Sequence, residues 1–137
     1  LRHEDVERLS FADDSFDLII SNDVLEHVVS PKHALAEASR VLRPRGEFLL
    51  TVPFYRENAE SGTRAELVNG EIKHVLPPVY HGNPVSDEGS LVFTDFGWDL
   101  LQDIRDVGFS DAKLHFCWSE VYGHLGPEIH YIHAIKT

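Results

Sequence analysis

The sequence predicts an α/β fold in which parallel strands are followed by a closing antiparallel pair. Two short apolar runs, at residues 16–21 and 48–52, are typical of strands covered on both faces, because neither alternates with polar residues. A helical pattern at 31–42 separates them. Residues 111–118 alternate between apolar and polar side chains, and a glycine-containing turn joins them to an expected strand at 129–135. Two strands joined in this way pair antiparallel.

The first apolar run is the element around which the chain is organised. It ends abruptly in Ser21, Asn22 and Asp23, residue types that favour turns and helix caps. Open α/β sheets bind ligands outside the carboxyl ends of their strands, so this polar cluster is a candidate site. A core strand followed by a solvated turn is the alternative interpretation. Residues 24–28 are expected to form a short helical turn.

Helix signals follow at two places. Ser30 and Pro31 supply a capping hydroxyl and a proline at the first helical position, and a stripe of apolar residues follows, formed by Leu35, Ala38 and Leu42. Residues 43–46 end this helix in a surface turn. The second helix is expected to be capped by Thr94 or Asp95 and to stop at Gly108.

Residues 54–93 contain many glycines and prolines and show no sustained periodicity. A connection of this length is unusual in a compact domain, so it is interpreted as a lid or a binding insertion. A structural loop packed by its own side chains is the alternative. The whole chain, residues 1–137, is interpreted as one partial domain that carries this insertion.

Charge and cysteine content exclude several classes of partner. The chain has 12 basic and 23 acidic residues, a net charge of −11, which disfavours binding to nucleic-acid backbones and to anionic membranes. Cys117 is the single cysteine, so no intrachain disulfide forms, and a cytoplasmic location is expected.

The nine histidines raise the question of a metal site. Cys117, His124, His130 and His133 lie near one another in the sequence. Positions 130 and 133 of a strand point to opposite faces, whereas a closed zinc site needs four converging ligands. No metal site is therefore predicted.

Four segments, in order and at matching spacing, resemble one family. They are residues 5–11, 14–19, 23–28 and 40–46, and the resemblance is to the Rossmann-like (class I) S-adenosylmethionine-dependent methyltransferases, type 11 group. It runs from about residue 5 to 53 and continues more weakly to the end. One departure is Arg45, where the family usually has glycine.

The resemblance implies S-adenosylmethionine as cofactor and assigns its binding residues. The Asp5 carboxylate would accept a hydrogen bond from the adenine amino group, and the Val6 backbone N–H would meet a ring nitrogen. Ser21 and Asn22 would line the methionine end. His27 is the candidate catalytic residue, because imidazole accepts a proton near neutral pH. A solvated carboxylate at Asp5 and a packed helix histidine at position 27 are the alternatives.

The acceptor is expected to be a small molecule. The expected strand ends in Ser21, Asn22 and Asp23, not in the Pro-Pro-aromatic pattern of enzymes that methylate amino groups of nucleic acids. The sequence leaves open whether oxygen, nitrogen or carbon is methylated.

The resemblance also implies that this chain is the C-terminal part of a methyltransferase domain. In the family, a glycine-rich loop, two helices and three strands precede the position of Asp5, and no Gly-x-Gly occurs in this sequence. The chain alone is therefore expected to bind the cofactor weakly. The strand at 16–21 is expected to have one unpaired edge, and either self-association through it or covering segments beyond this sequence are predicted. A non-catalytic remnant acting as an interaction module is the alternative function.

Overall fold

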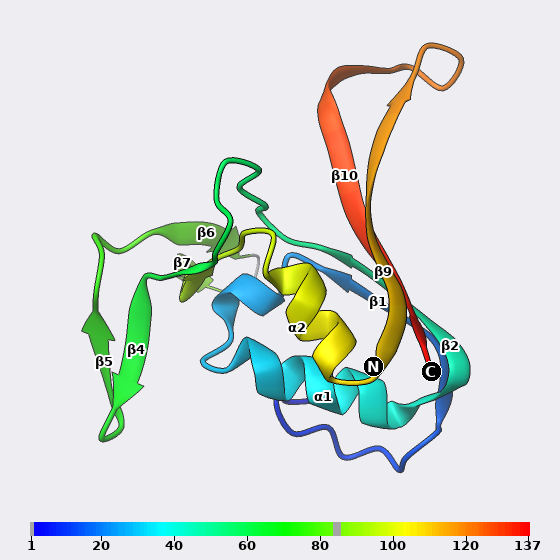
Figure 1. The fold of residues 1–137 in the computed structure, drawn as a ribbon. Coiled ribbons are helices and arrows are strands. Elements are labelled where there is room, and N and C mark those ends of the chain that lie inside the picture. Colours follow the sequence, from blue (N-terminus) through cyan, green and yellow to red (C-terminus); the bar gives the residue numbers. More distant parts are fainter. Residues whose placement is uncertain (1, 84–85) are drawn as a thin grey trace.

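The computed structural model describes residues 2–83 and 86–137, and a four-stranded sheet forms its centre (Figure 1). In spatial order the strands are β1 (Phe16–Asn22), β2 (Leu42–Thr51), β10 (His124–Lys136) and β9 (Phe109–Ser119). β1 and β2 run parallel, whereas β10 runs antiparallel to both of its neighbours. The predicted fold class is therefore confirmed.

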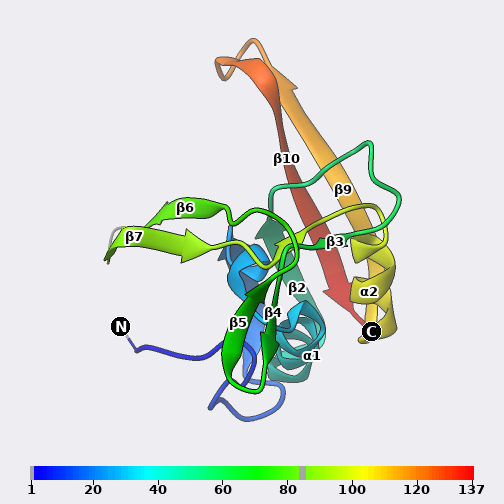
Figure 2. The same cartoon turned by 90° about the vertical axis from the view of Figure 1, so that its left-hand side faces the viewer.

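One face of the sheet and two helices enclose the core (Figure 2). The helices are α1 (Pro31–Val41) and α2 (Leu100–Asp106), and the short 3-10 helix η1 (Leu25–His27) follows β1. The core brings together buried residues from both helices and three strands, among them Leu35, Phe48, Ile104, Phe109 and Ala134. None of the helices in the described ranges is both long and apolar enough to cross a membrane.

The other face of β1 differs from the sequence prediction of a strand buried on both sides. Leu18 and Ile20 are 47% and 63% exposed, because no described helix covers this face. β1 also lies at the end of the strand order, with β2 as its pairing partner in the described part of the chain. The expected unpaired edge is thus present.

The start of α1 follows the sequence prediction. Ser30 is the N-cap, and its hydroxyl accepts a hydrogen bond from the backbone N–H of His33 at 3.4 Å, with Pro31 at the first helical position. The segment after α1 enters β2 directly at Leu42, so the predicted turn at 43–46 forms the beginning of that strand. Arg45 has φ +68°, a conformation that favours glycine, which explains the glycine usual at this position in the family.

The predicted cap of α2 is wrong. Thr94 and Asp95 form the short strand β8 (Thr94–Asp95), which pairs with β3 (Gly62–Thr63). Asp99 occupies the N-cap position, but its carboxylate accepts hydrogen bonds from Ser61 instead of capping the helix. Pairing with a distant strand thus overrides the local cap signal.

The insertion is more regular than the sequence predicted. Besides β3 it contains two hairpins, formed by β4 (Ala65–Val68) with β5 (Glu71–His74) and by β6 (Tyr80–Asn83) with β7 (Ser86–Leu91). The first hairpin turns at Asn69 and Gly70, both with positive φ, and Asn-Gly is a strong two-residue hairpin signal. The absence of sustained periodicity hid these strands, which are only two to six residues long.

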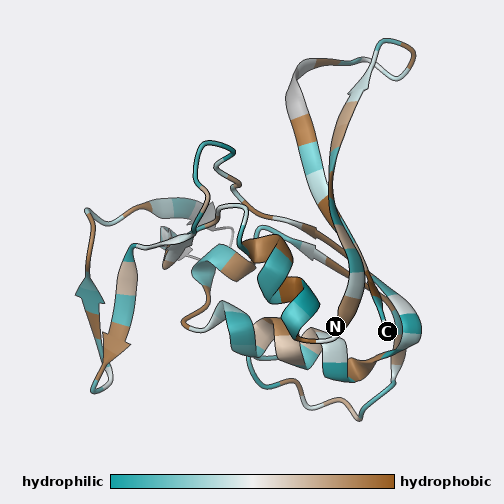
Figure 3. Cartoon of the chain, in the orientation of Figure 1, coloured by the Kyte–Doolittle hydropathy of each residue, from teal (hydrophilic) through white to brown (hydrophobic). Residues whose placement is uncertain are grey.

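β9 and β10 form a ribbon that extends beyond the sheet (Figure 1), and Figure 3 shows hydrophobic residues along this extension. Ala112, near the base, is 1% exposed. Phe116 and Trp118, on the same face in the sequence prediction, are 46% and 63% exposed. The predicted burial of this face holds at Ala112 and fails at Phe116 and Trp118, because the core covers only the first part of the ribbon.

A carboxylate and a guanidinium fasten the N-terminal segment to α1. Glu37 accepts hydrogen bonds from Arg40 at 2.8 Å and from the backbone N–H of Leu9 at 2.8 Å. Arg40 also donates to the carbonyl of Phe11 at 2.8 Å. The hydrogen bond with Arg40 is the main reason why the pKa of Glu37 lies below its usual value.

A lowered pKa makes stability depend on pH. An acid whose pKa is depressed on folding stabilises the native state above its unfolded pKa, and that stabilisation is lost as the pH falls. We therefore expect the melting temperature to fall as the pH is lowered from about 6 to about 3, and to fall less steeply in Glu37→Gln. The matched control is Glu66→Gln, on an exposed position of β4. Equal pH dependence in wild type and Glu37→Gln would contradict this assignment.

Candidate functional site

The carboxyl ends of β1 and β2 lie side by side and are joined by hydrogen bonds. Asn22 pairs with Thr51 in the parallel register. The next residue, Asp23, donates its backbone N–H to the Thr51 carbonyl at 3.1 Å, and its carboxylate accepts from the Thr51 hydroxyl at 3.1 Å. Asp23 has φ +49°, a region that aspartate tolerates better than most residues. The polar end of β1 is therefore a fixed turn at the edge where α/β folds bind ligands.

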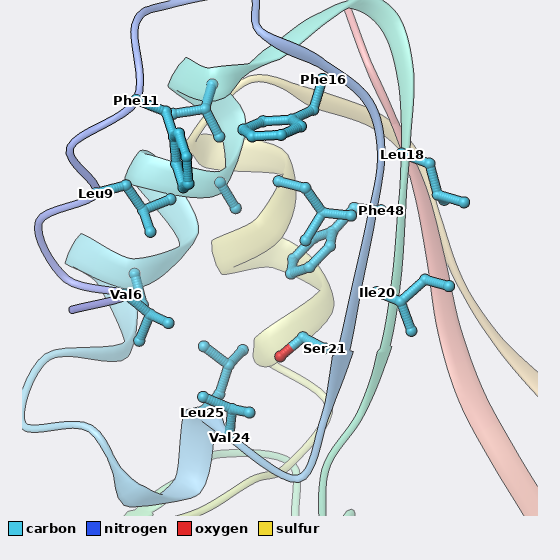
Figure 4. A pocket seen from close by; sticks show the side chains of 14 residues that line it. Val6, Leu9, Phe11, Phe16, Leu18, Ile20, Ser21, Val24, Leu25 and Phe48 are labelled. Atoms are coloured by element: carbon cyan, nitrogen blue, oxygen red, sulfur yellow. The ribbon is translucent and has the colours of Figure 1, made fainter. Parts of the chain in front are cut away.

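An apolar cavity of about 330 Å³ opens beside β1 (Figure 4). Its walls come from the N-terminal segment, β1, α1, β2 and the residues after β1. All lining residues except Ser21 are apolar: Val6, Leu9, Phe11, Phe16, Leu18, Ile19, Ile20, Val24, Leu25, Ala34, Ala38, Val41 and Phe48. The cavity can receive an apolar or flat aromatic group, with the Ser21 hydroxyl as the polar side chain on its wall.

The structure brings two of the four predicted cofactor residues to this cavity. Val6 and Ser21 line it from different segments of the chain. Asp5 and Asn22 are exposed and do not belong to its lining.

A tight turn presents Asp5 at the surface. The Asp5 carboxylate accepts the backbone N–H of Glu7 at 3.0 Å, and the Asp5 carbonyl accepts that of Arg8 at 2.9 Å. The Glu7 carboxylate in turn accepts the backbone N–H groups of Val29 and Ser30. These bonds fix the turn against the start of α1. A carboxylate has lone pairs for further donors, so the bond to Glu7 leaves Asp5 able to accept from a ligand.

His27 lies outside the cavity lining and contacts the insertion. It is the last residue of η1, and its Nδ1 is 2.8 Å from the Leu91 carbonyl at the end of β7. The backbone N–H of Phe93 also donates to the Glu26 carbonyl at 2.7 Å. Two hydrogen bonds thus hold the insertion against the segment that follows β1.

Glu26 and His81 are the residues that sequence reasoning missed. Glu26 is 0% exposed, and its Oε1 lies 3.6 Å from His27 Nε2 and 3.6 Å from His81 Nδ1. Burial is the largest influence on this carboxyl and raises its pKa above the usual value. Glu26 directly precedes His27, the candidate catalytic residue. Nothing in the sequence indicates that Glu26 contacts His81, which lies in a hairpin far along the chain.

The histidines and cysteine weighed in the sequence do not gather. His133 Nε2 is 2.9 Å from Glu47, and His130 Nε2 is 3.2 Å from the Val52 carbonyl. Within residues 2–83 and 86–137, one group of three potential metal ligands lies close together, and it consists of Glu26, His27 and His81.

Comparison with known proteins finds similarity to methyltransferases. Residues 1–50 match a family model described as "Methyltransferase domain". A sarcosine/dimethylglycine N-methyltransferase from Halorhodospira halochloris is 29% identical over 134 residues, which cover 96% of this chain and 46% of that protein. The chain thus spans less than half the length of this curated relative.

Solved structures share the fold. An S-adenosylmethionine-dependent methyltransferase from Mesorhizobium loti superposes with a TM-score of 0.61 at 17% identity, over 96% of this chain and 67% of that one. A 1,6-didemethyltoxoflavin-N1-methyltransferase from Burkholderia thailandensis, solved with bound 1,6-didemethyltoxoflavin and S-adenosylhomocysteine, gives a TM-score of 0.52 at 19% identity, over 96% of this chain and 48% of that one.

Proposed function

We propose that the chain belongs to the class I S-adenosylmethionine-dependent methyltransferases and that the protein transfers the methyl group of this cofactor to a small-molecule acceptor. The proposal rests mainly on which residues match the family model. Residues 1–50 contain every residue that the sequence assigned to the site: Asp5, Val6, Ser21, Asn22 and His27. The fold of this segment puts the end of β1 at the ligand-binding edge of a parallel strand pair.

The proposed cofactor contacts use both a fixed turn and an apolar wall. The Asp5 carboxylate accepts a hydrogen bond from the adenine amino group, and the backbone N–H of Val6 donates one to a ring nitrogen of adenine. The Val6 side chain lines the cavity together with Ser21, so an adenine bound at the turn lies near apolar surface. Ser21 and Asn22 face the methionine end. In-line methyl transfer needs ordered reactants, and orientation alone can supply roughly 7–11 kcal/mol.

The acceptor is proposed to be small and to bind under the insertion. The strand end at Ser21 and Asn22 lacks the Pro-Pro-aromatic pattern, and a relative's name specifies sarcosine and dimethylglycine. Two hydrogen bonds join residues 91 and 93 to the segment after β1, which supports a lid role for residues 54–93 that would exclude water. His27 is proposed to accept the proton that an acceptor loses.

The test is turnover by the protein expressed from its complete reading frame. We expect S-adenosylhomocysteine to form from S-adenosylmethionine with at least one member of a panel of small amines, phenols and carbon acids. Absence of both cofactor binding and turnover would contradict the proposal and favour the non-catalytic interaction module.

Asp5→Ala should weaken cofactor binding by about 1–3 kcal/mol, because it leaves the adenine amino group without its acceptor. Calorimetric titration with S-adenosylhomocysteine measures the change. Asp87→Ala, an exposed aspartate on β7, is the matched control and should bind as wild type does. Equal affinity in Asp5→Ala and wild type would remove Asp5 from the adenine site.

His27→Ala should lower kcat by about 10²–10⁴-fold, the range of a general base, and change cofactor affinity little. Steady-state kinetics at saturating cofactor gives kcat, and the control is His33→Ala, an exposed histidine of α1. Unchanged kcat in His27→Ala would remove this residue from the chemistry.

A further inference from the structure

The buried carboxylate of Glu26 lacks the partners that such a group needs. Its side chain is 0% exposed, and neither oxygen has a hydrogen-bond partner among the described residues. Burying an ionised carboxylate is costly unless it is paired, hydrogen-bonded or bound to a metal ion. An unsatisfied group of this kind in a native fold therefore points to a missing partner.

The distances around Glu26 are longer than hydrogen bonds and close to the spacing of ligands on one metal ion. Its Oε1 is 3.6 Å from both His27 Nε2 and His81 Nδ1, and the three ligand atoms lie within 4.8 Å of one another. In N–H···O hydrogen bonds the nitrogen and oxygen atoms are most often about 2.9–3.0 Å apart. Two ligands about 2.1 Å from a tetrahedral zinc ion lie about 3.4 Å apart.

The environment of His27 prepares it as a ligand. A carbonyl oxygen can only accept, so the hydrogen bond to Leu91 places the proton of the neutral ring on Nδ1. The lone pair is then on Nε2, the nitrogen that faces Glu26. Histidines that bind metal ions commonly donate their other N–H to a carbonyl or carboxylate in this way.

His81 comes from the insertion and closes the group. Its ring lies edge-on to that of His27, with centroids 5.0 Å apart. The side chains of His81 and His27 are 38% and 20% exposed, so the group is open to solvent on the side of the histidines while Glu26 is buried behind it. An ion held here would have positions left for water or another oxygen ligand.

We propose that Glu26, His27 and His81 bind a divalent first-row transition-metal ion, which fastens the β6–β7 hairpin of the insertion to the segment after β1. Two imidazoles and one carboxylate suit zinc, iron or manganese better than calcium. Because metal affinity is measured without cofactor or acceptor, this proposal stands or falls independently of the proposed function.

The proposed metal site also bears on the role of His27 as a general base. An ion at Nε2 uses the electrons that a general base would use, so the effect of His27→Ala on turnover would act through the ion.

Cobalt binding by the complete protein, stripped with a chelator, tests the site directly, because protein-bound Co²⁺ absorbs in the visible range. We expect one equivalent to bind and to be displaced by Zn²⁺. Glu26→Gln and His81→Ala should each lower the affinity at least about tenfold. His74→Ala, an exposed histidine on β5 of the same insertion, should bind as wild type does.

A second measurement separates ligation from a loss of structure. Without metal, Glu26→Gln should be at least as stable as wild type, because it removes a buried charge. Zinc should raise the melting temperature of wild type and of His74→Ala, but not that of Glu26→Gln or His81→Ala. No stoichiometric cobalt binding by wild type, or equal binding by wild type and both ligand variants, would overturn the proposal.

Discussion

Replacing Phe48 with alanine should lower the free energy of unfolding by about 3–5 kcal/mol. Phe48 lies on β2, the strand between β1 and β10, and is 2% exposed. Its ring stacks on that of Phe109 with centroids 5.6 Å apart, and it also forms part of the cavity wall. The truncation removes packing from the Phe109 ring and from the cavity wall. Because the cavity already lies beside residue 48, few neighbouring atoms can move in to fill the volume that the phenylalanine ring leaves.

Urea unfolding at equilibrium measures this loss. The control is Phe116→Ala, which removes the same ring from the exposed part of the ribbon, where it lies 5.5 Å from the Arg56 guanidinium. That change should cost below about 1 kcal/mol. Where Phe48→Ala does not fold, Phe48→Leu takes its place, with a smaller loss. Similar losses at positions 48 and 116 would show that the core is not where the structure puts it.

Replacing Ile20 with lysine should weaken self-association of the 137-residue chain. β1 has an unpaired edge in the described structure, and Leu18 and Ile20 add exposed apolar surface beside it. No lysine or proline interrupts residues 16–22, although these residues commonly protect strand edges. We therefore expect the wild-type chain to associate through β1, and Ile20→Lys to weaken association at least about tenfold, equivalent to about 1.4 kcal/mol.

Sedimentation over a range of concentrations gives the association constant. Leu67→Lys is the matched control, because Leu67 is 49% exposed on β4, away from the central sheet. It should associate as wild type does. A wild-type chain that stays monomeric at high concentration, with the amides of residues 18–20 protected from hydrogen exchange, would contradict the assignment of β1 as the associating edge.

The parts of the fold that the sequence predicted well have local causes. Ser30 and Pro31 define the start of α1 through a cap and a fixed φ, and both act within one helical turn. The end of β1 was visible because Ser21, Asn22 and Asp23 interrupt an apolar run. Interactions of this kind involve neighbouring residues, so a single sequence is enough to reveal them.

The parts that were missed depend on distant partners. Thr94 and Asp95 have the chemistry of a helix cap, yet Gly62 and Thr63 recruit them into a strand pair. Asn69-Gly70 is the exception, because the turn of this hairpin is a local signal that two neighbouring residues carry.

The residues of the candidate site also fall into two groups, those that the sequence predicted and those that only the structure reveals. Family resemblance supplied Val6 and Ser21, and the structure brings both to one cavity. The buried position of Glu26 and its approach to His81 depend on how the insertion folds back over η1. No periodicity or spacing in the sequence encodes that contact, so it required the structure.

The most direct test of the central claim is a titration of the complete, isotope-labelled protein with S-adenosylhomocysteine, followed by amide NMR. We expect the amide signals of Val6, Ser21 and Asn22 to shift in a saturable manner, while those of residues 119–124 at the tip of the ribbon stay in place. Saturable binding that leaves residues 5–6 and 21–22 unmoved, or no binding at all, would contradict the account.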